Sequence, residues 1–137
     1  MANDVLLNKA ATIERCVARA REEYAASPDF ATDYHRQDAA ILNIQRACQA
    51  VLDMGQHLVY AEKLGLPQDA RGVFDLLQQA GWIDKALSNE MKKMAGFRNL
   101  AVHEYQEIAL PIVVGIIQRG LDSCLTFSST VLKGKIV

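Results

Sequence analysis

The chain has 137 residues, of which 50% are hydrophobic and 23% charged, and its formal net charge is −1. This length fits one domain, and the composition excludes an intrinsically disordered chain because half of the residues can contribute to a core. The near-neutral charge excludes a protein that is basic overall, the usual footprint of nucleic-acid binding, but it allows a local basic pocket or one assembled from two chains.

Two long segments in the first half of the chain have apolar residues at helical spacing. The first predicts a helix over residues 4–25, which Ser27-Pro28-Asp29 ends. The second predicts a helix over residues 33–64, with Thr32 or Asp33 as its N-cap, and Gly65-Leu66-Pro67 ends it. Its apolar positions alternate in steps of three and four, a seam typical of helix bundles. The seam consists of Ile41, Ile44, Cys48, Val51, Gly55 and Leu58.

The second half predicts three more helices. A short one covers residues 70–80 and is followed by Gly81 as a C′ residue. The next begins near residues 83–84 and ends at Leu100 or Ala101, and the last covers residues 110–132 with Pro111 in its first turn. The core candidates of the last helix are Ile112, Ile116, Leu121, Leu125 and Val131. We therefore predict an all-α domain over 1–137, an antiparallel up-and-down bundle of four main helices plus a short extra helix.

The cysteines and the N-terminus indicate a cytoplasmic protein. Cys16, Cys48 and Cys124 are odd in number, widely spaced and set in apolar helical patterns, so we expect buried free thiols in a reducing compartment. The N-terminus has no basic region followed by an apolar stretch, and no uninterrupted apolar run approaches the ~20 residues of a membrane span.

Three residues at the end of the fourth predicted helix form the main candidate site: Arg98, His103 and Tyr105. At ~100° per residue, Arg98 and His103 would point about 140° apart on an unbroken helix. They converge only if the helix ends between them or if a second copy supplies the partner. A cation, an imidazole and a phenol thus gather at a helix-to-loop junction, where functional groups are often displayed.

This stretch resembles the motif of the HEPN superfamily, specifically of the HepT-like toxins: an arginine, four residues, a histidine, one residue and a tyrosine. Here it reads Arg98-Asn99-Leu100-Ala101-Val102-His103-Glu104-Tyr105. Residues 91–99 and 43–58 also look like the family, and the resemblance covers nearly the whole chain. It implies a metal-independent endoribonuclease toxin of a type VII-like toxin–antitoxin system, without a cofactor and with Arg98 and His103 as catalytic residues.

The chemistry of RNA cleavage fits these residue types. RNA carries its own nucleophile, the 2′-hydroxyl, so the protein has to supply a base, an acid and positive charge. The imidazole of His103 can take or give a proton, and the guanidinium of Arg98 can hold phosphate oxygens in a bidentate fork. A two-fold homodimer would offer two histidines, one on each side of the phosphate of a tRNA or mRNA. No HExxH or other metal-ligand spacing occurs. In the competing interpretation, Arg98 and His103 only satisfy the last carbonyls of their helix.

Tyr105 also has two interpretations. The resemblance implies a partner, a MntA-type minimal nucleotidyltransferase antitoxin, that transfers AMP to this tyrosine. The added phosphate would lie beside Arg98 and His103 and compete with the phosphate of the substrate. In the alternative, Tyr105 is a half-buried aromatic residue that fixes the turn over residues 103–110.

Further residues are candidates for supporting contacts with Arg98. Asp53 and His57 share a face of the second helix. Asp53 is either a semi-buried carboxylate that orients Arg98 or half of a solvated pair with His57, and Asn99 adjoins Arg98. Four cations form either a modest basic rim for RNA or solvated helix faces: Arg46, Lys92, Lys93 and Arg98.

A second hypothesis belongs to a different class of function. In it the chain is a non-catalytic HEPN module that binds nucleotides, or that serves as partner and substrate of a nucleotidyltransferase. The near-neutral charge favours this module, whereas the intact pair of Arg98 and His103 favours the nuclease. A purely structural helical dimer is the third interpretation.

Overall fold

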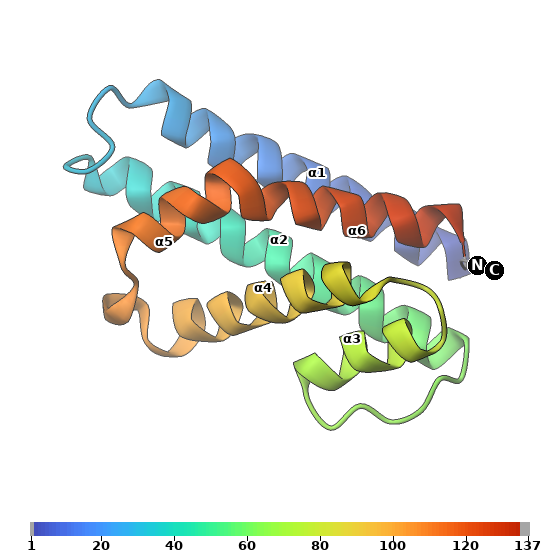
Figure 1. Cartoon of the computed structure of the whole chain (residues 1–137). Helices are drawn as coiled ribbons and strands as arrows, with labels where there is room; N and C mark the ends of the chain where they lie inside the picture. Colours follow the sequence, from blue (N-terminus) through green and yellow to red (C-terminus); the bar gives the residue numbers. More distant parts are fainter. Residues whose placement is uncertain (1, 135–137) are drawn as a thin grey trace.

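Two long antiparallel helices, α1 (Ala2–Ala26) and α2 (Tyr34–Ala61), form a hairpin in which α2 lies between α1 and the later helix α4 (Lys85–His103), as Figure 1 shows. The structure is a computed structural model, and it describes residues 2–134. Asp33 is the N-cap of α2, since its carboxylate accepts a hydrogen bond from the backbone N–H of Arg36 at 3.2 Å. The predicted seam of α2 is buried along its length, so the bundle interpretation of this helix is confirmed.

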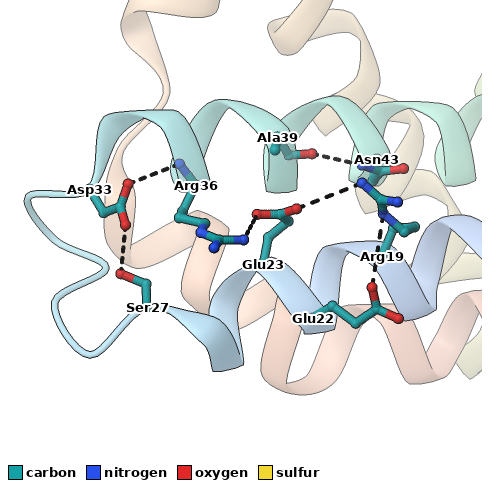
Figure 2. Close-up of polar contacts among 8 residues, drawn as sticks. All are labelled: Arg19, Glu22, Glu23, Ser27, Asp33, Arg36, Ala39 and Asn43. Carbon is teal, nitrogen blue, oxygen red and sulfur yellow. Dashed lines mark hydrogen bonds and ion pairs between the residues drawn. The ribbon is translucent and has the colours of Figure 1, made fainter.

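Polar contacts fix the closed end of the α1–α2 hairpin, and Figure 2 shows them together. The carboxylate of Glu23 on α1 accepts a hydrogen bond from Nη1 of Arg36 on α2 at 2.7 Å, and it lies 3.8 Å from the guanidinium of Arg19. Ser27 donates a hydrogen bond to Asp33 at 3.1 Å. These contacts join the two ends of the connecting loop and so hold the first turns of α2 against α1.

The remaining helices complete the bundle. They are α3 (Ala70–Gln79), α4 (Lys85–His103), a 3-10 turn η1 (Tyr105–Glu107), α5 (Leu110–Gly115), a π-helical turn η2 (Ile116–Gly120) and α6 (Leu121–Lys133). α4 packs against α2, α3 and α6, and α6 packs against α1 and α2 (Figure 1). With α5, η2 and α6 taken as one long helix, the predicted all-α fold of four main helices and a short extra one is confirmed.

The predicted core of the last helix is wrong at its first position. Ile112 is 52% exposed and Ile116 only partly buried, whereas Val113 and Ile117 are buried. Val113, Ile117 and the buried Leu121 follow one another in steps of four, which keeps them on one face of a helix. The predicted set took a step of five from Ile116 to Leu121, about 140° around a helix, so its earlier members lie one residue before the buried face.

The last helix passes a test for membrane spans that is based on length and mean hydropathy, although its apolar run is interrupted. By length and composition alone, Leu110–Lys133 is long and apolar enough to cross a membrane, a test that the core helix of a soluble protein also passes. Its buried side chains face α1, α2 and α4 within the bundle. They are Val113, Ile117, Leu121, Cys124, Phe127 and Val131. The apolar face of this helix is therefore part of the bundle core.

The three cysteines are buried free thiols, as predicted. Burial raises the pKa of Cys124 to about 12 and raises that of Cys48 well above its ordinary value. Because the thiolate is the reactive form, both groups are inert at neutral pH.

α2 and α3 approach each other closely at Gly55. A Cβ added there would lie 2.9 Å from Cγ1 of Val73 and 3.4 Å from Cδ1 of Leu77. Val73 is fully buried and β-branched, so it cannot turn away. We expect Gly55→Ala to lower the free energy of unfolding by about 1–3 kcal/mol through overpacking.

Gly96 of α4 offers the matched control for this substitution. Nothing lies within 4 Å of a Cβ added there. Gly96→Ala should therefore raise the free energy of unfolding by roughly 0.5–1 kcal/mol, because alanine loses less backbone entropy on folding. Urea denaturation of both variants measures the difference, and a shift of the same sign in both would contradict close packing at Gly55.

Candidate functional site

Arg98, in the second half of α4, is held by two neutral amide groups. Its Nε donates a hydrogen bond to Oε1 of Gln49 on α2 at 2.8 Å, and its Nη1 donates one to Oδ1 of Asn99 at 2.9 Å. Amide oxygens orient a guanidinium without cancelling its charge. Among residues 2–134 no carboxylate forms an ion pair with Arg98. The site thus presents a fixed positive charge that is not neutralised.

A chain of polar contacts stands behind Arg98. Nε2 of Gln49 donates to Oδ1 of Asp53 at 2.8 Å, and the other oxygen of Asp53 accepts from Nζ of Lys9 at 3.2 Å. Arg98 is only a donor and a carboxylate is only an acceptor, so this orientation of the Gln49 amide satisfies both neighbours. Asp53 therefore reaches Arg98 through Gln49 and does not contact it directly.

Gln49 is the residue of this cluster that the sequence analysis missed. It lies one turn before Asp53 on α2, at the i, i+4 spacing that brings side chains together. That spacing could have indicated the contact between Gln49 and Asp53. It does not show that Gln49 also contacts Arg98, which lies 49 residues further along the chain.

His57 is not brought to this cluster. Its Nε2 is buried without a hydrogen-bond partner among the described residues, and it lines a separate cavity of about 280 Å³ with Leu6, Trp82 and Val131. No hydrogen bond joins it to Asp53 within residues 2–134, where Asp53 binds Gln49 and Lys9 instead. The expected pair of Asp53 and His57, and a supporting role of His57 toward Arg98, find no contact in the structure.

His103 is the last residue of α4, and its side chain is exposed. The predicted end of this helix at Leu100 or Ala101 was wrong, because backbone hydrogen bonds continue until the N–H of Glu104 binds the carbonyl of Leu100. Of the two ways in which Arg98 and His103 were expected to converge, a helix end between them is therefore excluded. Helical geometry directs the two side chains about 140° apart on α4.

Tyr105 lies in η1, just after α4, and is tied to the beginning of α2. Its hydroxyl donates a hydrogen bond to Oδ1 of Asp38 at 2.5 Å. Burial, together with the hydrogen bond and the negative charge of Asp38, raises the pKa of Tyr105 to about 12. The phenol is therefore neutral at physiological pH, and its ring remains 42% exposed. No sequence signal pointed to Asp38, which is 67 residues away.

The predicted basic rim has fewer uncompensated cations than expected. Lys92 forms an ion pair with Asp75 of α3, and Lys93 forms one with Glu90 at 3.1 Å. Both lysines are thus compensated by neighbouring carboxylates. Arg46, by contrast, has no ion pair with any residue in the described range 2–134.

Within the part of the chain that the structure describes, the side chains do not form a metal-ligand cluster. Between residues 2 and 134, no group of three or more His, Cys, Asp or Glu side chains is placed to hold a metal ion. The groups around Arg98 are two amides, one carboxylate and one ammonium.

Comparison with known proteins agrees with the resemblance read from the sequence. A family model described as Ribonuclease HepT-like matches residues 12–131. Over 120 residues, which are 88% of this chain and 90% of the relative, the chain is 45% identical to the mRNA nuclease HepT of Shewanella oneidensis.

Solved structures give the same result. A crystal structure of a toxin–antitoxin with AMP-PNP matches with a TM-score of 0.89 and 41% identity, over 93% of this chain and 97% of that chain. A tri-AMPylated Shewanella oneidensis HEPN toxin in complex with an MNT antitoxin matches with a TM-score of 0.88 and 42% identity, over 93% and 96% of the two chains. This chain belongs to the HepT-like ribonuclease family.

Proposed function

We propose that the chain is a metal-independent endoribonuclease toxin of a cytoplasmic, type VII-like toxin–antitoxin system, active as a homodimer. Arg98 and His103 are its catalytic residues. The observation that carries the proposal is the state of Arg98, which two amide oxygens hold in place while its charge stays uncompensated in the described part of the chain. A structural arginine at a helix end would bind carbonyl oxygens or a carboxylate, whereas a phosphate-binding arginine needs this free charge.

The reaction follows from the groups present. The 2′-hydroxyl of RNA attacks the adjacent phosphorus while one His103 takes its proton. A second His103, from the other protomer, gives a proton to the departing 5′ oxygen, and Arg98 stabilises the charge of the phosphorane. The products are a 2′,3′-cyclic phosphate and a 5′-hydroxyl.

The homodimer is part of this proposal for a geometric reason. α4 is unbroken from Lys85 to His103, and the exposed imidazole points away from Arg98 on the same helix. A two-fold axis near the end of α4 would bring the His103 of each chain to the cleft that both Arg98 residues face.

The regulator that we infer is an MntA-type nucleotidyltransferase antitoxin that transfers AMP to Tyr105. Support comes from the similar solved structures, one a toxin–antitoxin complex and one a tri-AMPylated toxin. The substrate that we infer is mRNA, from the name of the Shewanella relative. A tRNA substrate is the alternative, because Arg98 and His103 contact phosphate and ribose and do not read bases.

The direct test is to map RNA ends after induction of the chain in a host without the antitoxin. We expect growth arrest together with new 3′ ends that carry 2′,3′-cyclic phosphate. Ends with a 5′-phosphate would contradict the 2′-hydroxyl mechanism. A harmless chain that produces no new ends would favour the non-catalytic module that serves as a substrate of the nucleotidyltransferase.

Gln49 gives a sharper test of the state of Arg98. Gln49→Glu keeps the size of the side chain but replaces a neutral acceptor with a carboxylate 2.8 Å from Nε of Arg98. The new ion pair should reduce the electrostatic stabilisation that Arg98 gives to the developing charge of the phosphorane. We therefore expect kcat to fall about 10- to 100-fold. Gln56→Glu, the same change on an exposed position of α2, is the control and should keep kcat. Equal rates in the two variants would contradict a positioning role for Gln49.

A further inference from the structure

A groove of about 780 Å³ runs between α1 and α2. Its two walls carry cations: Lys9, Arg15 and Arg19 from α1, and Arg46 from α2. Small apolar side chains also line it, namely Ala18, Ala39 and Ala50. The groove is thus open and basic on a protein whose overall net charge is −1.

Two of these four cations are compensated. Lys9 pairs with Asp53 at 3.2 Å, and Arg19 pairs with Glu22 and Glu23 at 4.0 and 3.8 Å (Figure 2). Because Asp53 and Glu22 also line the groove, these residues contribute no net charge to it. The positive potential of the groove must come from the other two cations.

Arg15 and Arg46 are the uncompensated pair. Within residues 2–134, Arg15 donates only a 3.5 Å hydrogen bond to the hydroxyl of Thr12, and Arg46 has neither an ion pair nor a hydrogen bond from its side chain. Both guanidinium groups lie close enough to the thiol of Cys16 to lower its pKa, against the burial that raises it. Cys16 lines the same groove, so the two free charges face one space from opposite walls.

The groove is connected to the candidate catalytic arginine through Gln49. Gln49 lines it, and the same Gln49 accepts the hydrogen bond from Nε of Arg98. Arg46 lies one turn before Gln49 on α2, about 4.5 Å along the helix axis. Arg15 and Arg46 therefore line the same groove as Gln49, the hydrogen-bond partner of Arg98.

We propose that this groove binds the phosphate backbone of the RNA strand that is cleaved at Arg98, and that Arg15 and Arg46 each hold a phosphate. The inference rests on the nuclease function proposed above. Arginine binds phosphate oxygens in a bidentate geometry and carries its charge at every physiological pH. Contacts of this kind position a strand without reading its bases, so the groove would accept many sequences.

The experiment measures binding of a single-stranded 2′-O-methyl RNA, which lacks the nucleophile and cannot be cleaved. Fluorescence anisotropy over a range of KCl concentrations gives the affinity and its salt dependence for the full-length protein. For Arg15→Gln with Arg46→Gln we expect a loss of about tenfold per arginine at low salt. The slope of log K against log [KCl] should become shallower by about 1.4, since each single-strand phosphate contact contributes about 0.7.

The matched control removes the same two charges elsewhere. Arg71→Gln with Lys85→Gln changes exposed residues of α3 and of the start of α4, outside the groove. This variant should keep both the wild-type affinity and the wild-type slope. Arg15→Lys and Arg46→Lys retain the charges and should keep most of the slope, which separates a loss of phosphate binding from a loss of folding.

The outcomes distinguish the groove from the catalytic proposal. In cleavage assays the double glutamine variant should raise KM and keep kcat, whereas loss of Arg98 should lower kcat. If wild type cleaves through Arg98 but the double variant binds with the wild-type slope, the groove proposal is overturned and the nuclease stands. If wild type neither binds nor cleaves RNA, both are overturned. Sedimentation gives the oligomeric state of the double variant. If this variant is monomeric where wild type is a dimer, and loses binding for that reason, the groove is an interface between copies and not an RNA site.

Discussion

Arg98→Ala and His103→Ala are each expected to abolish RNA cleavage and to relieve growth arrest on expression. Loss of a general acid or base at His103 should lower kcat about 10²- to 10⁴-fold. Loss of the charge that stabilises the phosphorane at Arg98 should lower it about 10²- to 10³-fold. Initial rates of the purified variants on a labelled RNA measure both effects. Arg71→Ala, at an exposed position of α3, is the control and should leave the rate unchanged.

Mixing subunits tests whether one cleft needs both histidines. If wild-type and His103→Ala chains pair at random in equal amounts, only the homodimers of wild type keep two histidines in the shared cleft. The activity per total protein should then fall to about a quarter of the wild-type value, because the two groups act as one unit. A fall to about a half would mean that each chain carries an independent site.

The opposite result for the two single variants would mean that Arg98 and His103 have a structural role and not a catalytic one. If Arg98→Ala and His103→Ala arrest growth as wild type does, neither residue takes part in cleavage. Arg98 would then be a residue that joins α4 to α2 through Gln49, and the measurable effect of its loss would be on the free energy of unfolding. Denaturation of the same variants separates this outcome from simple misfolding.

The helices could be predicted from the sequence because their causes are local. The seam of α2 and the caps at Asp33 and Gly81 depend on neighbours within one or two turns, and all three appear where they were expected. Two details were wrong. In the last helix the buried positions Val113 and Ile117 lie one residue after the expected Ile112 and Ile116, and α4 continues past the expected end to His103.

The candidate site divides in the same way. Arg98, His103 and Tyr105 lie within eight consecutive residues, so a linear motif identifies them together. Their partners Gln49 and Asp38 come from a helix earlier in the chain, and only the packing of α2 against α4 and η1 brings them there. Helical periodicity placed Asp53 on the correct helix, but it could not show that Asp53 acts through Gln49 while His57 faces another cavity.

Tyr105→Phe is expected to keep RNA cleavage within a few-fold of wild type and to resist silencing by the nucleotidyltransferase. In the modification that we propose, the tyrosine oxygen attacks the α-phosphorus of ATP, pyrophosphate leaves and the hydroxyl proton is lost. The tyrosine oxygen can then no longer donate a hydrogen bond to Asp38. It carries a negatively charged phosphate instead, and before the modification this oxygen lay 2.5 Å from the carboxylate of Asp38. Two like charges at this distance repel each other, so we expect η1, which follows the end of α4 that carries His103, to move off α2.

In this proposal silencing has two physical parts, the negative phosphate that would compete for Arg98 and the displacement of η1 from Asp38. Phenylalanine has no oxygen to modify, and it leaves Asp38 exposed and solvated, so the cleft itself stays intact. The assay is co-incubation with the antitoxin and ATP, followed by intact-protein mass and residual cleavage. Tyr60→Phe, a change to another tyrosine that is 84% exposed on α2, is the control and should be modified and silenced as wild type is. If the partner modifies and silences the Tyr105→Phe variant normally, Tyr105 is not the switch, and its bond with Asp38 serves only to hold η1 on α2.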